Sequence, residues 1–237
     1  MKTLFHAASK RGHAQFDWLN SYHSFSFGHY HDPAKVHFGA LRVLNDDTVD
    51  PGMGFGKHPH DNMEIVSIPL YGDLHHQDST GRDEIIRHND VQIMSAGSGI
   101  AHSEFNANTD KPVKFLQIWV FPKLRNITPR YEQKTFLAAD RQNKFQTVVA
   151  PDDATANFIN QDAWFSLTNM SKDFESSYSV KKSGNGVYVF VIKGIVQIGD
   201  QVLNERDALG VWETSDFKIK STTDSEVLLI DIPMQLS

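Results

Sequence analysis

The sequence predicts an all-β fold of the sandwich or barrel type, on the basis of three observations. Short segments rich in β-branched and aromatic residues recur along the chain, turn-forming residues separate them, and long amphipathic helical patterns are missing. Many short strands at roughly even spacing are typical of sandwiches and barrels rather than of parallel sheets. The strand-like segments are His37–Leu44, Glu64–Leu70, Val91–Met94, Val113–Phe121, Gly186–Ile192, Ile195–Ile198, Ala208–Trp212 and Val227–Ile232.

The predicted turns consist of residues that tolerate positive φ or that hydrogen-bond their own backbone. Two segments, Ala138–Gln142 and Asp162–Trp164, are expected to form at most short helical turns. Pro69 lies inside a predicted strand, and because proline cannot donate a backbone hydrogen bond, we expect that strand at a sheet edge or with a bulge. The turn segments are Asn45–Asp47, Asp78–Gly81, Gly184–Gly186 and Gly199–Asp200.

The bulk composition is that of an ordinary globular protein. The chain has 237 residues, of which 40% are hydrophobic and 22% charged, enough for one large or two modest domains. No apolar run approaches the ~20 residues that a membrane-spanning helix needs, and Met1–Gln15 has no apolar stretch typical of a signal peptide. Cysteine is absent, so disulfides and thiolate chemistry are excluded. We expect no membrane partner and a cytoplasmic localisation.

The charge balance argues against direct binding of nucleic acid. The formal net charge is -6, and no run of Lys or Arg forms the basic stripe that direct binders usually carry. An acidic surface still permits contacts with a protein partner. The sequence therefore predicts no direct nucleic-acid contact and leaves a protein partner open.

The chain shows a faint internal repeat and a strong asymmetry in histidine. The pattern of strand, glycine, strand, turn and strand around Ile68–Val91 recurs with a shorter hairpin at Ile192–Ala208. A polar interruption near residues 130–145 predicts a boundary, with one domain at 1–134 and a second at 135–237. All 12 histidines lie at or before His102, so the predicted chemistry belongs to the first domain.

Two short motifs predict a metal site in that domain. His58 and His60 are two residues apart, as are His102 and Glu104, and on a strand such pairs point to the same side. A single His-x-His is a weak signal, since two unrelated imidazoles on a strand give the same pattern. Two converging pairs supply three imidazoles and one carboxylate, which suit Fe(II), Mn, Ni, Cu or Zn. On an octahedral ion, two positions would stay open for substrate or water.

The spacing of these motifs resembles that of the cupins, which is Gly-x5-His-x-His-x3-Glu followed by Gly-x2-His-x3-Asn. The matching residues are Gly52, His58, His60, Glu64, Gly99, His102 and Asn106. Further stretches resemble the pirin family, and the likeness covers essentially residues 1–135. These stretches are Tyr22–Phe27, Leu41–Asp46, Met94–Gly97, Gly99–Glu104 and Gln117–Trp119.

The resemblance to pirins implies two tandem cupin barrels, that is, double-stranded β-helices or jelly rolls that together form a bicupin. It implies a metal-binding cupin at 1–134 and a degenerate cupin without metal ligands at 135–237. It also implies one divalent transition metal held by His58, His60, His102 and Glu104, with Fe(II) as the first choice and Mn, Ni, Cu and Zn as alternatives. Glu64 is then a supporting residue and not a ligand, and His75 and His76 are expected at the surface or outside the ligand set.

The resemblance further implies an oxidoreductase of the quercetin 2,3-dioxygenase type, which cleaves flavonols with O2 and releases carbon monoxide. Glu104 would then act as general base on the substrate's 3-hydroxyl group. Phe55, Met63, Gln117 and Trp119, together with Phe25 and Phe27, are candidates to line a pocket for a small aromatic substrate, although aromatic residues on strands more often form core. The alternative is a pirin without enzymatic activity, which senses metal or redox state and acts as a protein-binding transcriptional coregulator.

Overall fold

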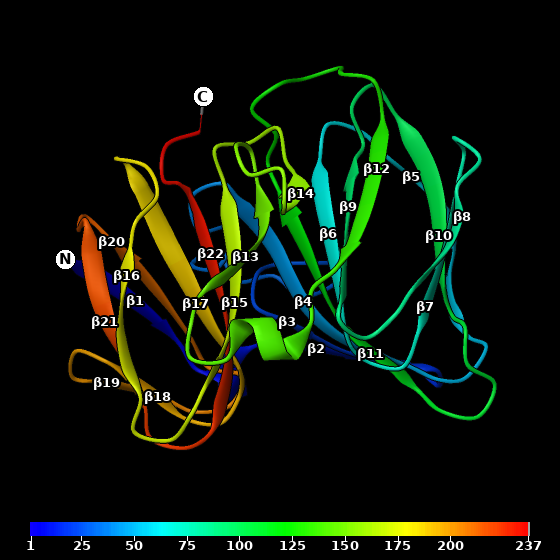
Figure 1. The fold of residues 1–237 in the computed structure, drawn as a ribbon. Coiled ribbons are helices and arrows are strands. Elements are labelled where there is room, and N and C mark those ends of the chain that lie inside the picture. Colours follow the sequence, from blue (N-terminus) through cyan, green and yellow to red (C-terminus); the bar gives the residue numbers. More distant parts are fainter. Residues whose placement is uncertain (237) are drawn as a thin grey trace.

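The computed structural model, which describes residues 1–236, contains two β-barrels side by side. Each barrel pairs a seven-stranded sheet with a four-stranded sheet (Figure 1). In the N-terminal barrel the sheets have the orders β12-β9-β6-β11-β4-β3-β2 and β5-β10-β7-β8. Their strands are β2 (Gly12–Gln15), β3 (Leu19–His23), β4 (Leu41–Val49), β5 (Gly54–His60), β6 (Glu64–Tyr71), β7 (Leu74–Asp78), β8 (Asp83–Ile86), β9 (Asp90–Ser95), β10 (Ile100–Asn106), β11 (Val113–Val120) and β12 (Arg130–Thr135).

The C-terminal barrel repeats this plan with the orders β1-β20-β17-β22-β15-β13-β14 and β16-β21-β18-β19. The all-β prediction and the two cupin barrels are confirmed, and the helical segments described are the short 3-10 turns η1 (Ala8–Lys10) and η2 (Ala138–Arg141). The strands are β1 (Lys2–His6), β13 (Gln146–Ala150), β14 (Asn157–Phe158), β15 (Trp164–Met170), β16 (Glu175–Ser179), β17 (Asn185–Lys193), β18 (Val196–Ile198), β19 (Gln201–Leu203), β20 (Ala208–Trp212), β21 (Asp216–Ser221) and β22 (Ser225–Pro233).

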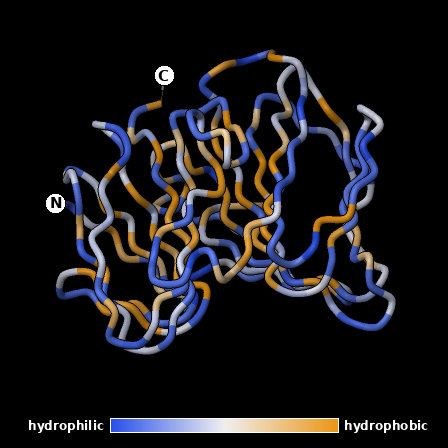
Figure 2. Tube along the Cα trace, viewed as in Figure 1, coloured by the Kyte–Doolittle hydropathy of each residue, from blue (hydrophilic) through white to orange (hydrophobic). Residues whose placement is uncertain are grey.

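The largest apolar core lies between the barrels rather than inside either of them. Leu44, Ile68 and Ile118 from the N-terminal sheet pack in one cluster with Phe190 and Leu228 from the C-terminal sheet. The hydrophobic segments accordingly concentrate where the two large sheets meet (Figure 2). Burial of this apolar surface joins the barrels into one unit.

The N-terminal strand belongs to the sheet of the other barrel. β1 pairs antiparallel with β20, in the register Lys2↔Trp212 to His6↔Ala208, and it forms the edge of the C-terminal seven-stranded sheet (Figure 1). The His6 ring also lies against Tyr188, whose hydroxyl is 2.9 Å from Nδ1. The domain limits 1–134 and 135–237 stay a prediction. β1 lies within the first of these ranges, but it pairs with a strand of the second.

Two local expectations are settled by the strand pairing. The predicted turn at Asn45–Asp47 is wrong, because these residues continue β4, which runs Leu41–Val49 instead of ending at Leu44. The cause is that both faces of this strand offer polar partners: Ser21 on the barrel side, and Arg11 and Arg206 around Asp46. Pro69 lies at a register shift between β11 and β6, so the bulge is present, although β6 is central in its sheet.

No helix among residues 1–236 is long and apolar enough to cross a membrane. The cytoplasmic localisation expected from the sequence stays a prediction.

Candidate metal centre

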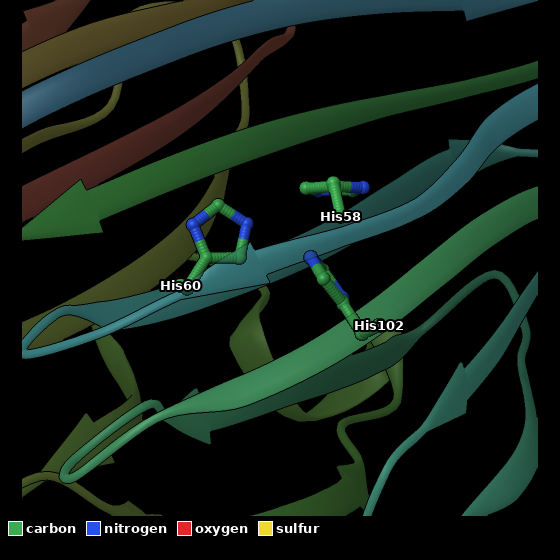
Figure 3. Close-up of side chains that lie close together, drawn as sticks. All are labelled: His58, His60 and His102. Atoms are coloured by element: carbon green, nitrogen blue, oxygen red, sulfur yellow. The ribbon is translucent and has the colours of Figure 1, made fainter.

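Three histidines from two paired strands converge inside the N-terminal barrel. His58 and His60 lie on β5 and His102 on β10, and the antiparallel register places His102 directly opposite His58. The ring centroids are 4.5 Å apart for His58 and His102, and 4.9 Å apart for the other two pairs. One ring nitrogen of each lies within 4.8 Å of the others, and the rings gather on one side of the strands (Figure 3). The i, i+2 spacing on β5 therefore produces the arrangement expected from the sequence.

The ring nitrogens of these histidines fit a cation. The Nδ1 atom of His58 is 2.7 Å from the carbonyl oxygen of Gly56, which can only accept, so Nδ1 carries the hydrogen and Nε2 keeps its lone pair. The Nε2 atoms of His60 and His102 are buried, and no protein group among the described residues lies within hydrogen-bonding distance of them. Buried nitrogen atoms without a partner are costly, and a divalent ion would satisfy these two while it accepts the lone pair of His58 Nε2 as well.

The local electrostatics keep two of the imidazoles neutral. Burial, followed by the nearby rings of His102 and His58, lowers the pKa of His60 to about 4. Burial, followed by His58 and His76, lowers the pKa of His102 to about 3, while the charge of Asp78 opposes the shift. Metal ligation requires the neutral imidazole, so at neutral pH these two side chains have no proton to release before they bind an ion.

Glu104 lies on the same strand as His102, beyond a β-bulge between the two residues. Glu104 is 2% exposed, and its carboxylate accepts hydrogen bonds from Ser67 Oγ (3.1 Å) and Gln117 Nε2 (2.6 Å). Glu104 has a carboxylate oxygen within 4.8 Å of ring nitrogens of His102 and His76, whereas the compact three-histidine group is formed without it. Its place as the fourth ligand therefore stays a proposal.

The structure gives Glu64 a supporting position away from the three histidines. It is buried and accepts hydrogen bonds from Ser95 Oγ (2.7 Å) and from Nδ2 of Asn160 (3.2 Å), which lies between β14 and β15 of the C-terminal barrel. Burial raises its pKa despite these two hydrogen bonds. Glu64 thus links the N-terminal barrel to the C-terminal barrel.

A cavity of about 760 Å3 opens beside the histidine cluster. His58, His60 and Glu104 form part of its wall, and Phe55, Gln117 and Trp119 from the predicted pocket line it. The other lining residues are His13, Ala14, Gln15, Phe16, Leu19, Ser21, His23, Phe27, Gly28, His29, Tyr30, Asn45 and Asp47. A volume of this size suits a small-molecule ligand.

Two of the predicted pocket residues lie elsewhere. Met63 packs against the cluster of Ile65, Met94, Ala96 and Ile100, because its carbonyl oxygen accepts the Ala96 amide (2.8 Å) and ties it to the end of β9. Phe25 belongs to the apolar core between the barrels. Both are corrections to the pocket prediction.

One wall of the cavity is polar and buried. Ser21 Oγ donates to Asp47 and lies 2.8 Å from Nε2 of His23. Burial raises the pKa of Asp47 to about 7, with contributions from the charges of Asp46 and Glu104, while the Ser21 hydrogen bond opposes the shift. Burial lowers the pKa of His23 to about 4. Near neutral pH, His23 is therefore uncharged and Asp47 is only partly ionised, so this wall offers a ligand hydrogen-bonding groups of reduced charge.

Sequence reasoning missed Ser67 and Asp78, and it left His76 open between the surface and a position outside the ligand set. Ser67 supports Glu104, and His76 is fully buried beside His102, which excludes the surface alternative. The signal was present, because His76 and Asp78 repeat the i, i+2 spacing of the two ligand motifs. It was obscured by the adjacent His75, which points outward and pairs with Asp83 (2.6 Å).

Two cupin barrels with a histidine cluster in only the first define the class of this protein as a bicupin. Within residues 1–236, both groups of histidine and acidic residues close enough to share an ion lie in the N-terminal barrel. Two family models match, Pirin over residues 5–120 and the quercetinase C-terminal cupin domain over residues 147–232. The chain belongs to the pirin family.

Similar proteins extend over the full length of the chain. A protein of Escherichia coli (strain K12) named quercetin 2,3-dioxygenase is 42% identical over 227 residues, which cover 95% of this chain and 96% of that protein. A pirin-like protein of Caulobacter vibrioides is 37% identical over 224 residues, covering 94% and 96%. The crystal structure of the bacterial pirin YhhW of Escherichia coli in complex with nickel(II) superimposes with a TM-score of 0.93 at 39% identity, covering 98% of this chain and 99% of that one.

Proposed function

We propose that this protein is a metal-dependent dioxygenase that cleaves flavonols such as quercetin with O2 and releases carbon monoxide. The observation that carries the proposal is the shared wall of the cavity, where His58, His60 and Glu104 meet aromatic side chains. Relatives that carry the name quercetin 2,3-dioxygenase over 95% of the chain support the choice of substrate class. A flat polyphenol fits a cavity with aromatic walls and buried hydrogen-bonding groups.

The proposed ligands are His58, His60, His102 and Glu104, with Fe(II) as the first metal to test and Mn, Ni, Cu and Zn as alternatives. The unpartnered Nε2 atoms of His60 and His102 support this assignment, and the nickel(II) complex of YhhW shows that a relative binds a divalent ion. When bound, such an ion supplies Lewis acidity and redox chemistry. The carbonyl group of Gly56 orients His58, and Ser67 and Gln117 orient Glu104.

Glu104 is the proposed general base. Its carboxylate lies at the cavity wall, so it can take the proton of a substrate hydroxyl group that reaches the metal centre. Gln117 connects this carboxylate to the pocket, because its amide donates to Glu104 and its oxygen accepts from Trp119 Nε1 at 3.2 Å. Trp119 in turn packs edge-on against His60, with ring centroids 4.9 Å apart. Substrate contacts at Trp119 would thus be transmitted to both the base and a ligand.

The first experiment is anaerobic reconstitution with Fe(II), Mn(II), Ni(II) or Cu(II), followed by an O2-dependent quercetin assay. We expect loss of the flavonol absorbance with release of carbon monoxide, and neither in the His58→Ala/His60→Ala double variant. Tight metal binding without turnover for every ion would contradict the proposal and favour the metal-sensing alternative. In the same assay, Glu104→Gln with full activity and normal metal content would rule out the role of this carboxylate as base.

A further inference from the structure

His76 is a fully buried imidazole that the proposed ligand set does not use. It lies on β7 with 0% exposure, and because neighbours on a strand point to opposite faces, His75 faces outward while His76 faces the barrel interior. Its ring packs between those of His102 and Tyr131, at centroid distances of 5.2 and 5.0 Å. Contacts with two rings hold the imidazole in a defined orientation.

The partner of His76 on the far side from His102 is the Asp78 carboxylate. Nε2 of His76 lies 3.1 Å from Oδ2 of Asp78, and the two side chains are 1% and 0% exposed. Asp78 also accepts hydrogen bonds from the backbone amide (2.8 Å) and the hydroxyl (2.6 Å) of Thr80. The backbone amide of Arg82 is a third donor to the same oxygen (3.4 Å), and a carboxylate that accepts from several donors is favoured in its ionised form. An ionised carboxylate only accepts, so Nε2 of His76 carries the hydrogen.

The hydrogen bond donated by His76 to Asp78 determines the hydrogen positions on His102. A neutral His76 with its hydrogen on Nε2 presents a lone pair at Nδ1, which faces Nδ1 of His102 at 3.5 Å. His102 then donates from Nδ1, and its own lone pair lies at Nε2. That Nε2 atom is the buried one without a protein partner, in the cluster with His58 and His60. A continuous series of hydrogen-bonded groups thus runs from Asp78 through His76 to His102, whose Nε2 atom faces the cluster.

We propose that His76 and Asp78 are positioning residues that hold His102 in the tautomer and ring orientation needed for metal binding. The inference rests on the metal site of the proposed function but not on flavonol turnover. It assigns His102 a buried imidazole–carboxylate pair as support, whereas His58 is supported by the carbonyl group of Gly56. Outer partners of metal-binding histidines fix the tautomer and raise the basicity of the ligand, and their loss typically costs about 10–100-fold in metal affinity.

The test is a comparison of four variants of the full-length protein. His76→Leu retains most of the volume but offers no acceptor to His102, and we expect its Ni(II) affinity to fall by about 10–100-fold. His76→Asn places an amide oxygen near the position of Nδ1 and is expected to recover a large part of that loss. Asp78→Asn keeps the shape of the carboxylate without its charge and is expected to lie between these variants and the wild type.

The matched control is His75→Leu, which removes the neighbouring imidazole and its surface contact with Asp83. It should leave Ni(II) affinity unchanged. Affinity is measured by calorimetry and by competition with a chelator, and the ligand field by the visible spectrum of the Co(II)-loaded protein. Circular dichroism and thermal unfolding of the metal-free variants check the fold. A purely structural role for His76 would shift the unfolding temperature without changing the Co(II) spectrum of the folded protein.

The inference is overturned if His76→Leu and His75→Leu bind Ni(II) equally well and give the wild-type Co(II) spectrum. It is also overturned if the wild type binds two ions and His76→Leu binds one, because His76 would then be a ligand. A wild type that binds no ion under any condition removes this inference together with the metal site. Altered affinity in a protein that never cleaves a flavonol supports the positioning role and contradicts the proposed function alone.

Discussion

The two barrels share one architecture and differ in what fills them. In the C-terminal barrel the inward face of the large sheet is aliphatic and packs into a continuous core, which includes Val187, Val189, Val191, Val227 and Leu229. In the N-terminal barrel the corresponding face is largely polar around the cavity, where Ser21, Asn45, Asp47 and Gln117 line the wall. The same strand arrangement thus encloses either a packed core or a site for chemistry.

This difference shows how the N-terminal barrel tolerates a polar interior. The opposite face of its large sheet is apolar and packs against the C-terminal barrel, through residues such as Leu44, Val66 and Ile118. Two smaller apolar clusters reach the cavity wall, one around Phe115 through Leu19 and Phe55, and another around Ile65 through Trp119. The C-terminal barrel therefore contributes packing surface to its neighbour, which is free to keep its interior for ligands.

The largest effect is expected from a variant that loses metal binding and activity but keeps its fold. In the His58→Ala/His60→Ala variant we expect metal content to fall to background and flavonol cleavage to be abolished, because two of the three clustered imidazoles are lost. The metal-free protein should keep a stability close to that of metal-free wild type, since the removed rings form no part of the main cores. Metal analysis and urea unfolding measure the two quantities. A variant that fails to fold would show that the histidine cluster also contributes to the stability of the fold.

The converse experiment weakens the barrel that binds no metal through histidine. Leu229→Ala is expected to lower the free energy of unfolding by about 2–5 kcal/mol, because it opens a cavity in a fully buried aliphatic core. Asn45→Ala is the matched change in the polar barrel, where the buried Oδ1 has no hydrogen-bond partner, and it should cost about 1 kcal/mol or less. Equal losses in urea unfolding would contradict the contrast between the barrels.

The third prediction concerns the strand that the N-terminus adds to the C-terminal barrel. Burial, followed by the charge of Lys35, lowers the pKa of His6 from 6.5 to about 4, while Asp32 opposes the shift. Between these pH values the unfolded chain binds a proton that folded His6 does not, so stability is present above pH 6.5 and is lost as the pH falls toward 4. This loss amounts to about 3 kcal/mol for His6.

His6→Gln removes this proton and keeps a polar group beside the hydroxyl of Tyr188. The variant should lose less stability than the wild type between pH 6.5 and pH 4, as measured by denaturant unfolding at several pH values. Thr3→Ala, at an exposed position of β1 without a titratable group, is the control and should follow the wild-type pH dependence. Parallel curves for all three proteins would show that β1 does not dock with a neutral His6.

The smallest effect is expected at Ser67, which supports the carboxylate of Glu104. Ser67→Ala removes one of its two protein hydrogen bonds and should cost about 1–2 kcal/mol of stability at most. We expect a several-fold decrease in kcat with little change in metal content, because Gln117 still holds the carboxylate. Steady-state kinetics with metal analysis provide the measurement, and an unchanged kcat would mean that Gln117 alone orients Glu104.

Much of the site was predictable because its geometry is local. His58 and His60 share a face of β5 by strand periodicity, and the motif at His102 lies on the strand that pairs with it. His76 and Asp78 obey the same periodicity, but nothing in the chain tells which face of their strand is inward when His75 is equally polar. The turn predicted at Asn45–Asp47 failed for a related reason, since three polar residues in a row form a strand only where both faces offer them partners.

The sequence by itself determined the all-β class, the repeat of two barrels and the histidines of the first one, because these follow from strand periodicity and motif spacing. Tertiary structure alone decided that β1 pairs with the sheet of the other barrel and that the main core lies between the two large sheets. It also decided that His76, which is hydrogen-bonded to Asp78, contacts His102. These features depend on contacts between residues far apart in the chain, and side-chain order along one strand does not specify which distant face it will meet.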